Sequence, residues 1–269
     1  MVTDHRSPIT DHLDVALLGA KGMLAKMVRE RAPQNYRLHL YDLPEFDVTD
    51  RDQVLQEMRQ VQPDIIINCA AYTDVDDCET EVELANRVNG SAAGYLAEAA
   101  RSVDATLVHI STDYVFDGRK DSPYREEDPV NPQSVYGASK LLGEQAILNS
   151  GLKKYFNVRT SSLYGPGGKN FVETILRLVG ERVELRIVAD QVGSPTYTAD
   201  LADAIFHLLA LTDDRSPITD HSPYGAYHFA NEGQCSWYEF ACAIVAEARS
   251  HNLSVVTREI LSIRTEEYP

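Results

Sequence analysis

The chain has 269 residues, 43% of them hydrophobic and 25% charged, which is typical of a folded protein with one or two domains and excludes a disordered chain. Its formal net charge of −16 repels nucleic-acid backbones and anionic lipid surfaces, so we expect neither as a partner. The charge does not exclude a nucleotide ligand, because N–H groups at a helix N-terminus hold phosphates without basic side chains.

The chain shows no export or membrane signal. Its apolar runs fall short of the roughly 20 residues that cross a bilayer, and residues 1–6 are too polar for a signal peptide. The four cysteines lack C-x-x-C spacing. Free thiols are therefore favoured over disulfides or a zinc site, and we predict a cytoplasmic protein.

One ten-residue segment occurs twice. Residues 3–12 recur as residues 212–221, with His5 replaced by Asp214. Solenoid repeats are about 20 residues or longer and need several copies, so the duplication does not indicate a repeat architecture. Each copy has little to bury, and we interpret the copies as a tolerated extension at 1–12 and a surface loop at 212–222. A recognition tag is the alternative.

Between the two copies, short apolar runs alternate with helical patterns. Strands are predicted at 15–18, 38–41, 64–67, 105–110 and 156–159, and helices at 23–30, from Asp50, at 82–99 and from about Gln133. Asp50, with Gln53 three residues later, resembles a capping box. Continuous apolar strands separated by helices indicate a parallel sheet covered on both faces. The sequence therefore predicts an α/β, Rossmann-like doubly wound domain over residues 13–165.

The pattern weakens after Gly165. Helices are predicted at 171–180, 198–210 and 237–249, and short strands at 184–188 and 226–229. We interpret residues 166–269 as a smaller substrate-binding lobe that partly returns to the core. Such a lobe would lie across the carboxyl ends of the strands, where ligands bind in these folds.

A glycine-containing turn follows the first predicted strand. In Gly19-x-x-Gly22-x-x-Ala25, the first glycine permits a sharp turn, the second lets a pyrophosphate approach the backbone, and the alanine allows close helix packing. The motif alone is weak, but Asp42 follows about 20 residues later, where a carboxylate accepts hydrogen bonds from an adenosine ribose. The alternative is that Asp42-Leu-Pro only makes a turn. No arginine follows, so the sequence does not indicate strict NADP preference.

Tyr136-Gly-Ala-Ser-Lys140 lies in a predicted helix, which places Tyr136 and Lys140 one turn apart on the same face. An ordinary tyrosine, with a pKa of about 10, exchanges protons poorly at neutral pH unless its anion is stabilised. An ammonium about 5 Å away contributes about 3 kcal/mol at an effective dielectric near 20, but under about 1 kcal/mol in water. We therefore expect Lys140 to hold the tyrosine pKa down where bound cofactor and substrate exclude solvent.

Hydroxyl side chains end the fourth predicted strand, and we expect Thr112 to hydrogen-bond a substrate carbonyl and orient it toward Tyr136. Simple capping is the alternative for Ser111 and Asp117. The glycine turn, the strand-end hydroxyl and the Tyr-x-x-x-Lys pair follow in the order that a reductase site needs. The histidines show no metal-ligand spacing, so no metal site is assigned.

Several longer stretches resemble one family. They are INCAAYTDVD at 67–76, STDYVFDG at 111–118, YGASK at 136–140, RTS at 159–161, NF at 170–171 and DQVGSPT at 190–196. On these, residues 13–269 resemble the extended short-chain dehydrogenases/reductases and, within them, the dTDP-4-dehydrorhamnose reductases. The resemblance implies that NADPH or NADH reduces the 4-keto group of a dTDP-6-deoxy-hexulose, giving dTDP-L-rhamnose.

The resemblance also implies residue roles. Thr112, Tyr136 and Lys140 match the family's catalytic set, and Thr73, Tyr114 and Asn170 would face the dTDP-sugar. The cofactor would be lined by Gly19, Gly22, Met23, Leu24, Asp42, Ala70, Ala71, Tyr136 and Lys140. The family sometimes forms a magnesium-linked homodimer, so a homodimer and magnesium are expectations, although the sequence indicates no ligands for the ion.

Two departures from the family bear on function. Ser162 stands where the family usually has a tryptophan beside the sugar, which leaves the exact sugar open. The chain ends at Pro269, where members continue through an arginine–proline segment and a further helix. We therefore expect an incomplete substrate lobe, which favours binding over full turnover.

Three alternatives remain. Another nucleotide-4-keto-sugar reductase would share the same residues. Related dehydratases carry an acid where Tyr114 follows Thr112-Asp113, so Tyr114 favours reduction over elimination. A non-catalytic NAD(P)-binding regulatory subunit, resembling the β subunit of methionine adenosyltransferase, is the alternative from another class, and the intact Tyr136 and Lys140 argue against it.

Overall fold

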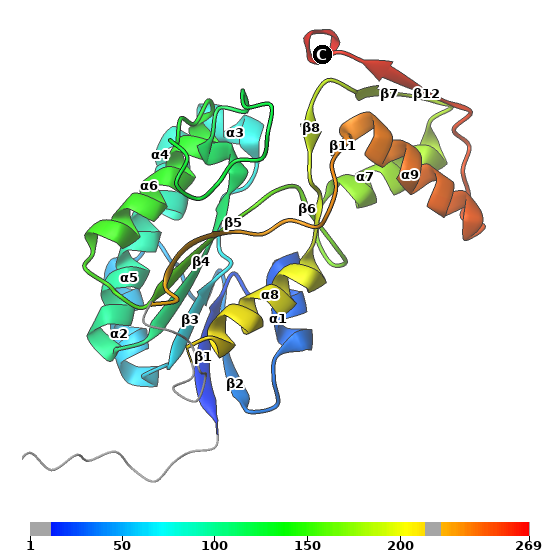
Figure 1. Ribbon diagram of the computed structural model, residues 1–269. Helices are drawn as coiled ribbons and strands as arrows, with labels where there is room; N and C mark the ends of the chain where they lie inside the picture. The colour runs from blue at the N-terminus through cyan, green and yellow to red at the C-terminus, as the bar shows by residue number, and fades with distance from the viewer. Residues whose placement is uncertain (1–11, 213–221, 269) are drawn as a thin grey trace, which may run out of the picture.

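The computed structural model describes residues 12–212 and 222–268. It has a sheet-centred part and a smaller lobe beyond the carboxyl ends of the strands (Figure 1). Both copies of the duplicated segment lie, apart from one terminal residue each, outside the described residues. Their interpretation therefore stays a prediction.

Six parallel strands form the central sheet, in the order β10-β5-β4-β3-β1-β2. They are β1 (Leu13–Leu18), β2 (Tyr36–Tyr41), β3 (Ile65–Asn68), β4 (Thr106–Thr112), β5 (Tyr155–Thr160) and β10 (Gly225–His228). The chain moves outward from β1 to β2 and then crosses back to β3, so the strand order reverses between β1 and β3. Ligands bind at such a reversal, and the predicted doubly wound α/β fold is confirmed.

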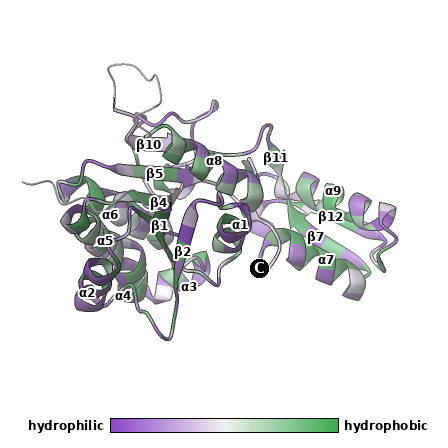
Figure 2. Ribbon diagram, turned by 90° about the horizontal axis from the view of Figure 1, so that it is seen from below, coloured by the Kyte–Doolittle hydropathy of each residue, from purple (hydrophilic) through white to green (hydrophobic). Residues whose placement is uncertain are grey.

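Helices cover both faces of this sheet. On one face lie α1 (Met23–Arg31) and α8 (Thr198–Ala210), and on the other α2 (Arg51–Val61), α5 (Ala92–Val103) and α6 (Val135–Asn149), as Figure 2 shows from below. Because successive strand residues point to opposite faces, Val15 and Leu17 join the first cluster while Ala16 and Leu18 join the second. Burial on both faces explains the continuous apolar runs.

The helix expected over residues 82–99 is interrupted. After α3 (Val75–Thr80), a short α4 (Val82–Ala85) passes into a π-helical turn, η1 (Asn86–Ser91), before α5 begins. Inside this turn, the buried Asn89 carboxamide accepts the Tyr72 N–H and donates to the Tyr72 carbonyl, both at 2.9 Å. The π-helical turn thus contains a side chain that holds a distant backbone segment, and hydrophobic periodicity in the sequence does not reveal such a contact.

The capping box predicted at Asp50 is half correct. The Asp50 side chain accepts the Gln53 N–H at 3.0 Å and so caps α2. The Gln53 side chain does not return the bond to Asp50, because its oxygen accepts the Asp47 N–H at 2.8 Å instead. The cap is therefore a single hydrogen bond, and the prediction of a reciprocal bond from Gln53 to Asp50 was wrong.

The smaller lobe has its own core. It contains α7 (Phe171–Glu181), α9 (Trp237–Ser250) and two parallel strands, β7 (Glu184–Val188) and β12 (Glu259–Ile263). A short 3-10 helix, η3 (Thr265–Glu267), follows β12. Ile175, Leu185 and Val245 are among its buried residues. The short strands β8 (Val192–Gly193) and β11 (Cys235–Ser236) pair beside it, as do β6 (Leu163–Tyr164) and β9 (Thr196–Tyr197) nearer the sheet.

Between β9 and β11 the chain leaves the smaller lobe and returns to the main sheet. α8 packs beside α1, and β10 pairs with β5 as the sixth strand. The strand predicted at 226–229 is thus part of the main sheet, because its backbone finds the open edge of β5. Among the described residues, the helices are too short or too polar to cross a lipid bilayer.

Candidate active site

The turn after β1 is tight and leads directly into α1. Gly19 has a φ of +69°, and a Cβ there would lie 2.6 Å from the Ala70 nitrogen, so the backbones that follow β1 and β3 meet at this point. Gly22 caps α1 without a side-chain hydrogen bond, and the first turn holds no acidic residue. The N–H groups of Met23 and Leu24 at this helix start therefore suit an anion such as a pyrophosphate.

Asp42 lies beside the turn, just after β2. Its carboxylate accepts the Lys21 N–H at 2.7 Å and the Leu43 N–H at 2.8 Å. The Lys21 ammonium donates to the Leu43 carbonyl and lies 3.9 Å from Glu45. Asp42 thus makes a turn, the alternative weighed above. Its role toward a cofactor stays a prediction.

The structure brings Thr112, Tyr136 and Lys140 together at the carboxyl end of β4. Thr112 ends the strand, and the other two lie one turn apart on α6, whose N-cap Ser134 accepts the Gly137 N–H at 3.1 Å. The side chains of Tyr136 and Thr112 share a hydrogen bond. Lys140 is 2% exposed and donates from Nζ to the Ile110 carbonyl at 2.6 Å.

Burial dominates the protonation of this group. It raises the pKa of Tyr136 to about 12, against the opposing effect of the hydrogen bond with Thr112. It lowers the pKa of Lys140 to about 8, against the opposing effect of Glu144. In the protein by itself, loss of hydration is thus the largest effect on the Tyr136 pKa. The expectation that Lys140 holds this pKa down concerned a site closed by cofactor and substrate, and it stays a prediction.

Asp113, which the sequence analysis did not assign, lies at the same place. Its carboxylate accepts from Thr112 Oγ1 at 3.2 Å, and burial raises its pKa to about 6. A negative Asp113 also raises the pKa of Tyr136. The signal was its position next to Thr112 at a strand end, but only the fold shows that the carboxylate is buried.

A small cleft of about 100 Å³ opens between this strand end and the smaller lobe. It is lined by Asp113, Tyr114, Ser162, Gln191, Val192, Gly193, Pro195, Cys235, Ser236, Trp237 and Phe240. Tyr114 is 42% exposed, and its ring stands edge-on to Tyr136 with 5.6 Å between centroids. Ser162, which replaces the family tryptophan, has a φ of +45°. The single tryptophan of the chain, Trp237, enters from α9, and sequence spacing did not point to it.

The other two expected substrate residues lie differently. Thr73 is exposed in the loop after β3. Asn170 caps α7: its oxygen accepts the Glu173 N–H at 3.1 Å, and its nitrogen donates to the carbonyls of Gly165 and Gly168 at 2.8 and 2.9 Å. Because the protein already uses these polar atoms, Asn170 shapes the loop in this structure, and its contact with substrate stays a prediction.

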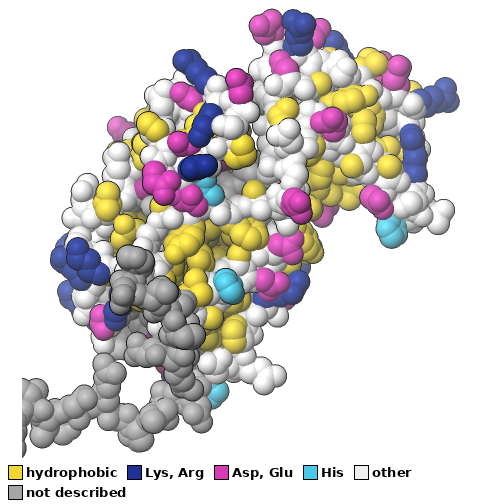
Figure 3. Space-filling view, in the orientation of Figure 1, with side chains coloured by type: hydrophobic (Ala, Val, Ile, Leu, Met, Phe, Trp, Pro, Cys, Tyr) yellow, Lys and Arg dark blue, Asp and Glu magenta, His cyan; other side chains and the backbone are white. Residues whose placement is uncertain are grey.

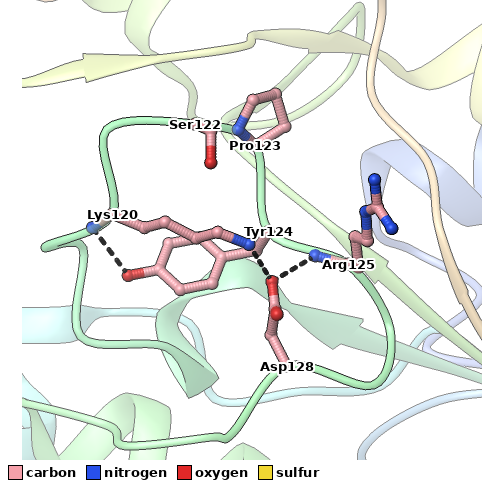
Figure 4. Close-up of a pocket in the computed structure, with 6 residues that line it drawn as sticks. All are labelled: Lys120, Ser122, Pro123, Tyr124, Arg125 and Asp128. Carbon is pink, nitrogen blue, oxygen red and sulfur yellow. Dashed lines mark hydrogen bonds and ion pairs between the residues drawn. The ribbon is translucent and has the colours of Figure 1, made fainter.

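A second hollow, of about 440 Å³, lies in the loop before α6 (Figure 4). It is lined by Lys120, Ser122, Pro123, Tyr124, Arg125 and Asp128. The Asp128 carboxylate accepts from the Lys120 ammonium and from the backbone N–H of Arg125. Lys and Arg side chains elsewhere on the visible face are scattered among Asp and Glu (Figure 3). The cleft lined by Asp113 and Tyr114 is the stronger candidate, because these residues follow Thr112 and the Tyr114 ring contacts Tyr136.

The chain is similar to proteins of one known family. Residues 13–269 match the family described as the RmlD substrate binding domain. A dTDP-4-dehydrorhamnose reductase of Aggregatibacter actinomycetemcomitans is 39% identical over 94% of this chain and 85% of its own length. The chain belongs to the dTDP-4-dehydrorhamnose reductase family.

Two other known proteins are similar over nearly the whole chain. The spore coat polysaccharide biosynthesis protein SpsK of Bacillus subtilis is 44% identical over 94% of this chain and 84% of its own length. The dTDP-4-dehydrorhamnose reductase of Bacillus anthracis, solved in complex with NADP, has a TM-score of 0.87 and 42% identity, covering 95% of this chain and 85% of that one. The similarity thus extends over sheet and lobe alike.

Proposed function

We propose that this chain is an oxidoreductase that reduces dTDP-4-dehydrorhamnose to dTDP-L-rhamnose with NADPH or NADH. The observation that carries the proposal is the meeting of Thr112 and Tyr136 at the end of β4, directly before Asp113 and Tyr114, which line the cleft. Relatives named for this reaction and the NADP complex of the Bacillus anthracis enzyme support it.

A reduced nicotinamide, when bound, supplies the hydride. Tyr136 donates the proton: its pKa of about 12 keeps the phenol protonated at neutral pH, so the proton is available when the carbonyl oxygen gains negative charge. Thr112 Oγ1, which donates to Asp113 in the structure, would turn its one hydrogen toward the same oxygen. Lys140 then stabilises the tyrosinate, which a closed site strengthens because the effective dielectric falls.

The dTDP-sugar would lie in the cleft between sheet and lobe. Tyr114 and Trp237 offer aromatic surfaces there, and Ser162 leaves more room than a tryptophan would. We infer that these three residues set the fit of the sugar nucleotide. Thr73 and Asn170 stay predictions, as do the homodimer, magnesium and the cytoplasmic location.

Tyr136→Phe tests the function. The wild-type protein should oxidise NADPH or NADH when mixed with dTDP-4-dehydrorhamnose, as followed by absorbance at 340 nm. The variant should bind the cofactor with unchanged affinity and lose about 10²-fold or more of the rate. Cofactor binding without oxidation by the wild type would contradict the proposal and favour the regulatory-subunit alternative. Oxidation with a different 4-keto sugar only would favour another sugar specificity.

A further inference from the structure

The loop between β6 and α7, residues 165–170, lies against the first turn of α1. A Cβ on Gly168 would be 3.1 Å from the Met23 Cβ, so loop and helix are in contact there. The Asn170 carboxamide, which closes the loop on the loop's own carbonyls, also donates to the Met23 sulfur at 3.7 Å. We refer to residues 165–170 as the strap.

Lys169 links the strap to the segment that follows β3. Its ammonium lies 3.7 Å from a carboxylate oxygen of Asp74, and its side chain is 90% exposed. At this distance the two charges attract each other but are too far apart for a good hydrogen bond. The other Asp74 oxygen accepts the Asp77 N–H at 3.4 Å and so caps α3. The strap therefore joins α1 to the segment after β3.

These two segments flank the turn at Gly19. A Cβ on Gly19 would lie 2.6 Å from the Ala70 nitrogen, so the segment after β3 begins directly against the turn. On the other side, the first turn of α1 carries the Met23 and Leu24 N–H groups that suit a pyrophosphate. Because the strap contacts Met23 itself, a diphosphate held by these N–H groups would lie beside the strap.

The strap and the helix place two ammonium groups in this region. Besides Lys169, Lys26 of α1 lies against Gly167, where a Cβ would be 2.9 Å from the lysine Cδ and 3.2 Å from its Nζ. The whole chain carries a net charge of −16 and so repels anions in general. Local positive charge beside the turn offsets that repulsion for a diphosphate.

We propose that Lys169 exchanges Asp74 for the diphosphate of the dinucleotide, so that the strap closes over the bound cofactor. The proposal rests on the proposed NAD(P)H site and assigns to it a further binding residue. Little is lost when the lysine leaves Asp74, because an exposed ion pair is weak. A diphosphate carries more negative charge than one carboxylate and attracts the ammonium more strongly. The flexible stem of a lysine permits the change of partner.

Dissociation constants of NADPH and NADH, measured by calorimetry without a sugar substrate, test the lysine. Lys169→Gln should raise both constants by the same factor, about fivefold, because the diphosphate is common to the two molecules. The factor should shrink as salt rises from about 0.05 M to about 0.5 M. Lys169→Arg keeps the charge and should bind nearly as wild type does. The control Lys153→Gln removes an exposed lysine at the amino end of β5 and should leave binding unchanged.

The aspartate gives a prediction of opposite sign. Asp74→Asn keeps the cap of α3, because asparagine caps a helix as well as aspartate does, and it frees Lys169. Both dinucleotides should then bind about threefold more tightly. In the Lys169→Gln background the same substitution should have a smaller effect, because no pair has to separate. Asp203→Asn removes an exposed carboxylate that pairs with Arg31 and should not change binding.

Three results would overturn the proposal. The first is unchanged binding of both dinucleotides by Lys169→Gln. The second is weaker binding by Asp74→Asn, or an equal gain with and without Lys169. The third is a loss of dTDP binding alone, which would assign Lys169 to the diphosphate of the sugar nucleotide. Since no turnover is needed, a protein that shows the expected binding but reduces no keto sugar would retain the strap and overturn the proposed function.

Discussion

Replacing Lys140 with methionine should stabilise the unliganded protein at neutral pH while removing its activity. The pKa of Lys140 is about 8 in the folded protein, against an ordinary value of 10.5. The unfolded chain therefore holds this proton more tightly than the folded one. Below pH 8 both states are protonated and the folded state carries the full penalty of the buried charge; between pH 8 and 10.5 the penalty disappears as pH rises.

The size of the effect follows from that difference. A depression of this size corresponds to about 3 kcal/mol. Methionine also gives up the hydrogen bond to the Ile110 carbonyl, worth about 1 kcal/mol. The net gain in unfolding free energy at pH 7 is then about 2 kcal/mol, or about 4–8 °C in Tm for a protein of this size.

Urea unfolding of wild type and Lys140→Met at pH 7 and pH 10.5 checks this reasoning. The difference between the two proteins should be large at pH 7 and vanish or reverse at pH 10.5. Lys154→Met removes an exposed lysine that pairs with Asp104 and should show neither effect. A Lys140→Met protein that is equally stable or less stable than wild type at pH 7 would refute the argument that burial of this ammonium is unfavourable.

Two further substitutions test the cofactor turn. Gly19→Ala places a methyl group about 2.6 Å from the Ala70 nitrogen at a φ of +69°, and it should weaken NADPH binding, measured by calorimetry, by more than about tenfold. The control Gly118→Ala has the same φ with open space around it and should bind NADPH normally. Equal losses of affinity in the two variants would show that backbone strain alone is responsible. Lys21→Ala removes the ammonium that donates to the Leu43 carbonyl, and it should weaken the binding of NADP(H) relative to NAD(H) by roughly fivefold, or about 1 kcal/mol. An unchanged ratio of the two dissociation constants would show that Lys21 does not influence the choice of cofactor.

Much of the candidate site was predictable because its residues follow local rules. The Gly19 turn and the strand-end Thr112 sit at positions that a doubly wound sheet dictates. Tyr136 and Lys140 needed only the helix period to share a face. Glu144 has the same spacing, yet a glutamate on a helix is ordinarily solvated, so its burial against Arg159 was not visible from spacing alone.

Other residues depended on contacts between distant segments. Asn170 was expected to meet substrate, but its carboxamide is satisfied by carbonyls of its own loop. Trp237 reaches the cleft only because α9 packs in the lobe opposite β4. The π-helical turn at η1 coincides with the grip of Asn89 on the Tyr72 backbone, which no hydrophobic period encodes.

The sequence by itself determined the alternation of strands and helices, the parallel sheet and the order of the turn, hydroxyl, phenol and ammonium along the chain, because these depend on periodicity and short-range backbone chemistry. The tertiary structure alone decided which charges lose their water. Burial is a property of neighbours brought from elsewhere in the chain, and it sets the protonation of Tyr136, Lys140 and Asp113.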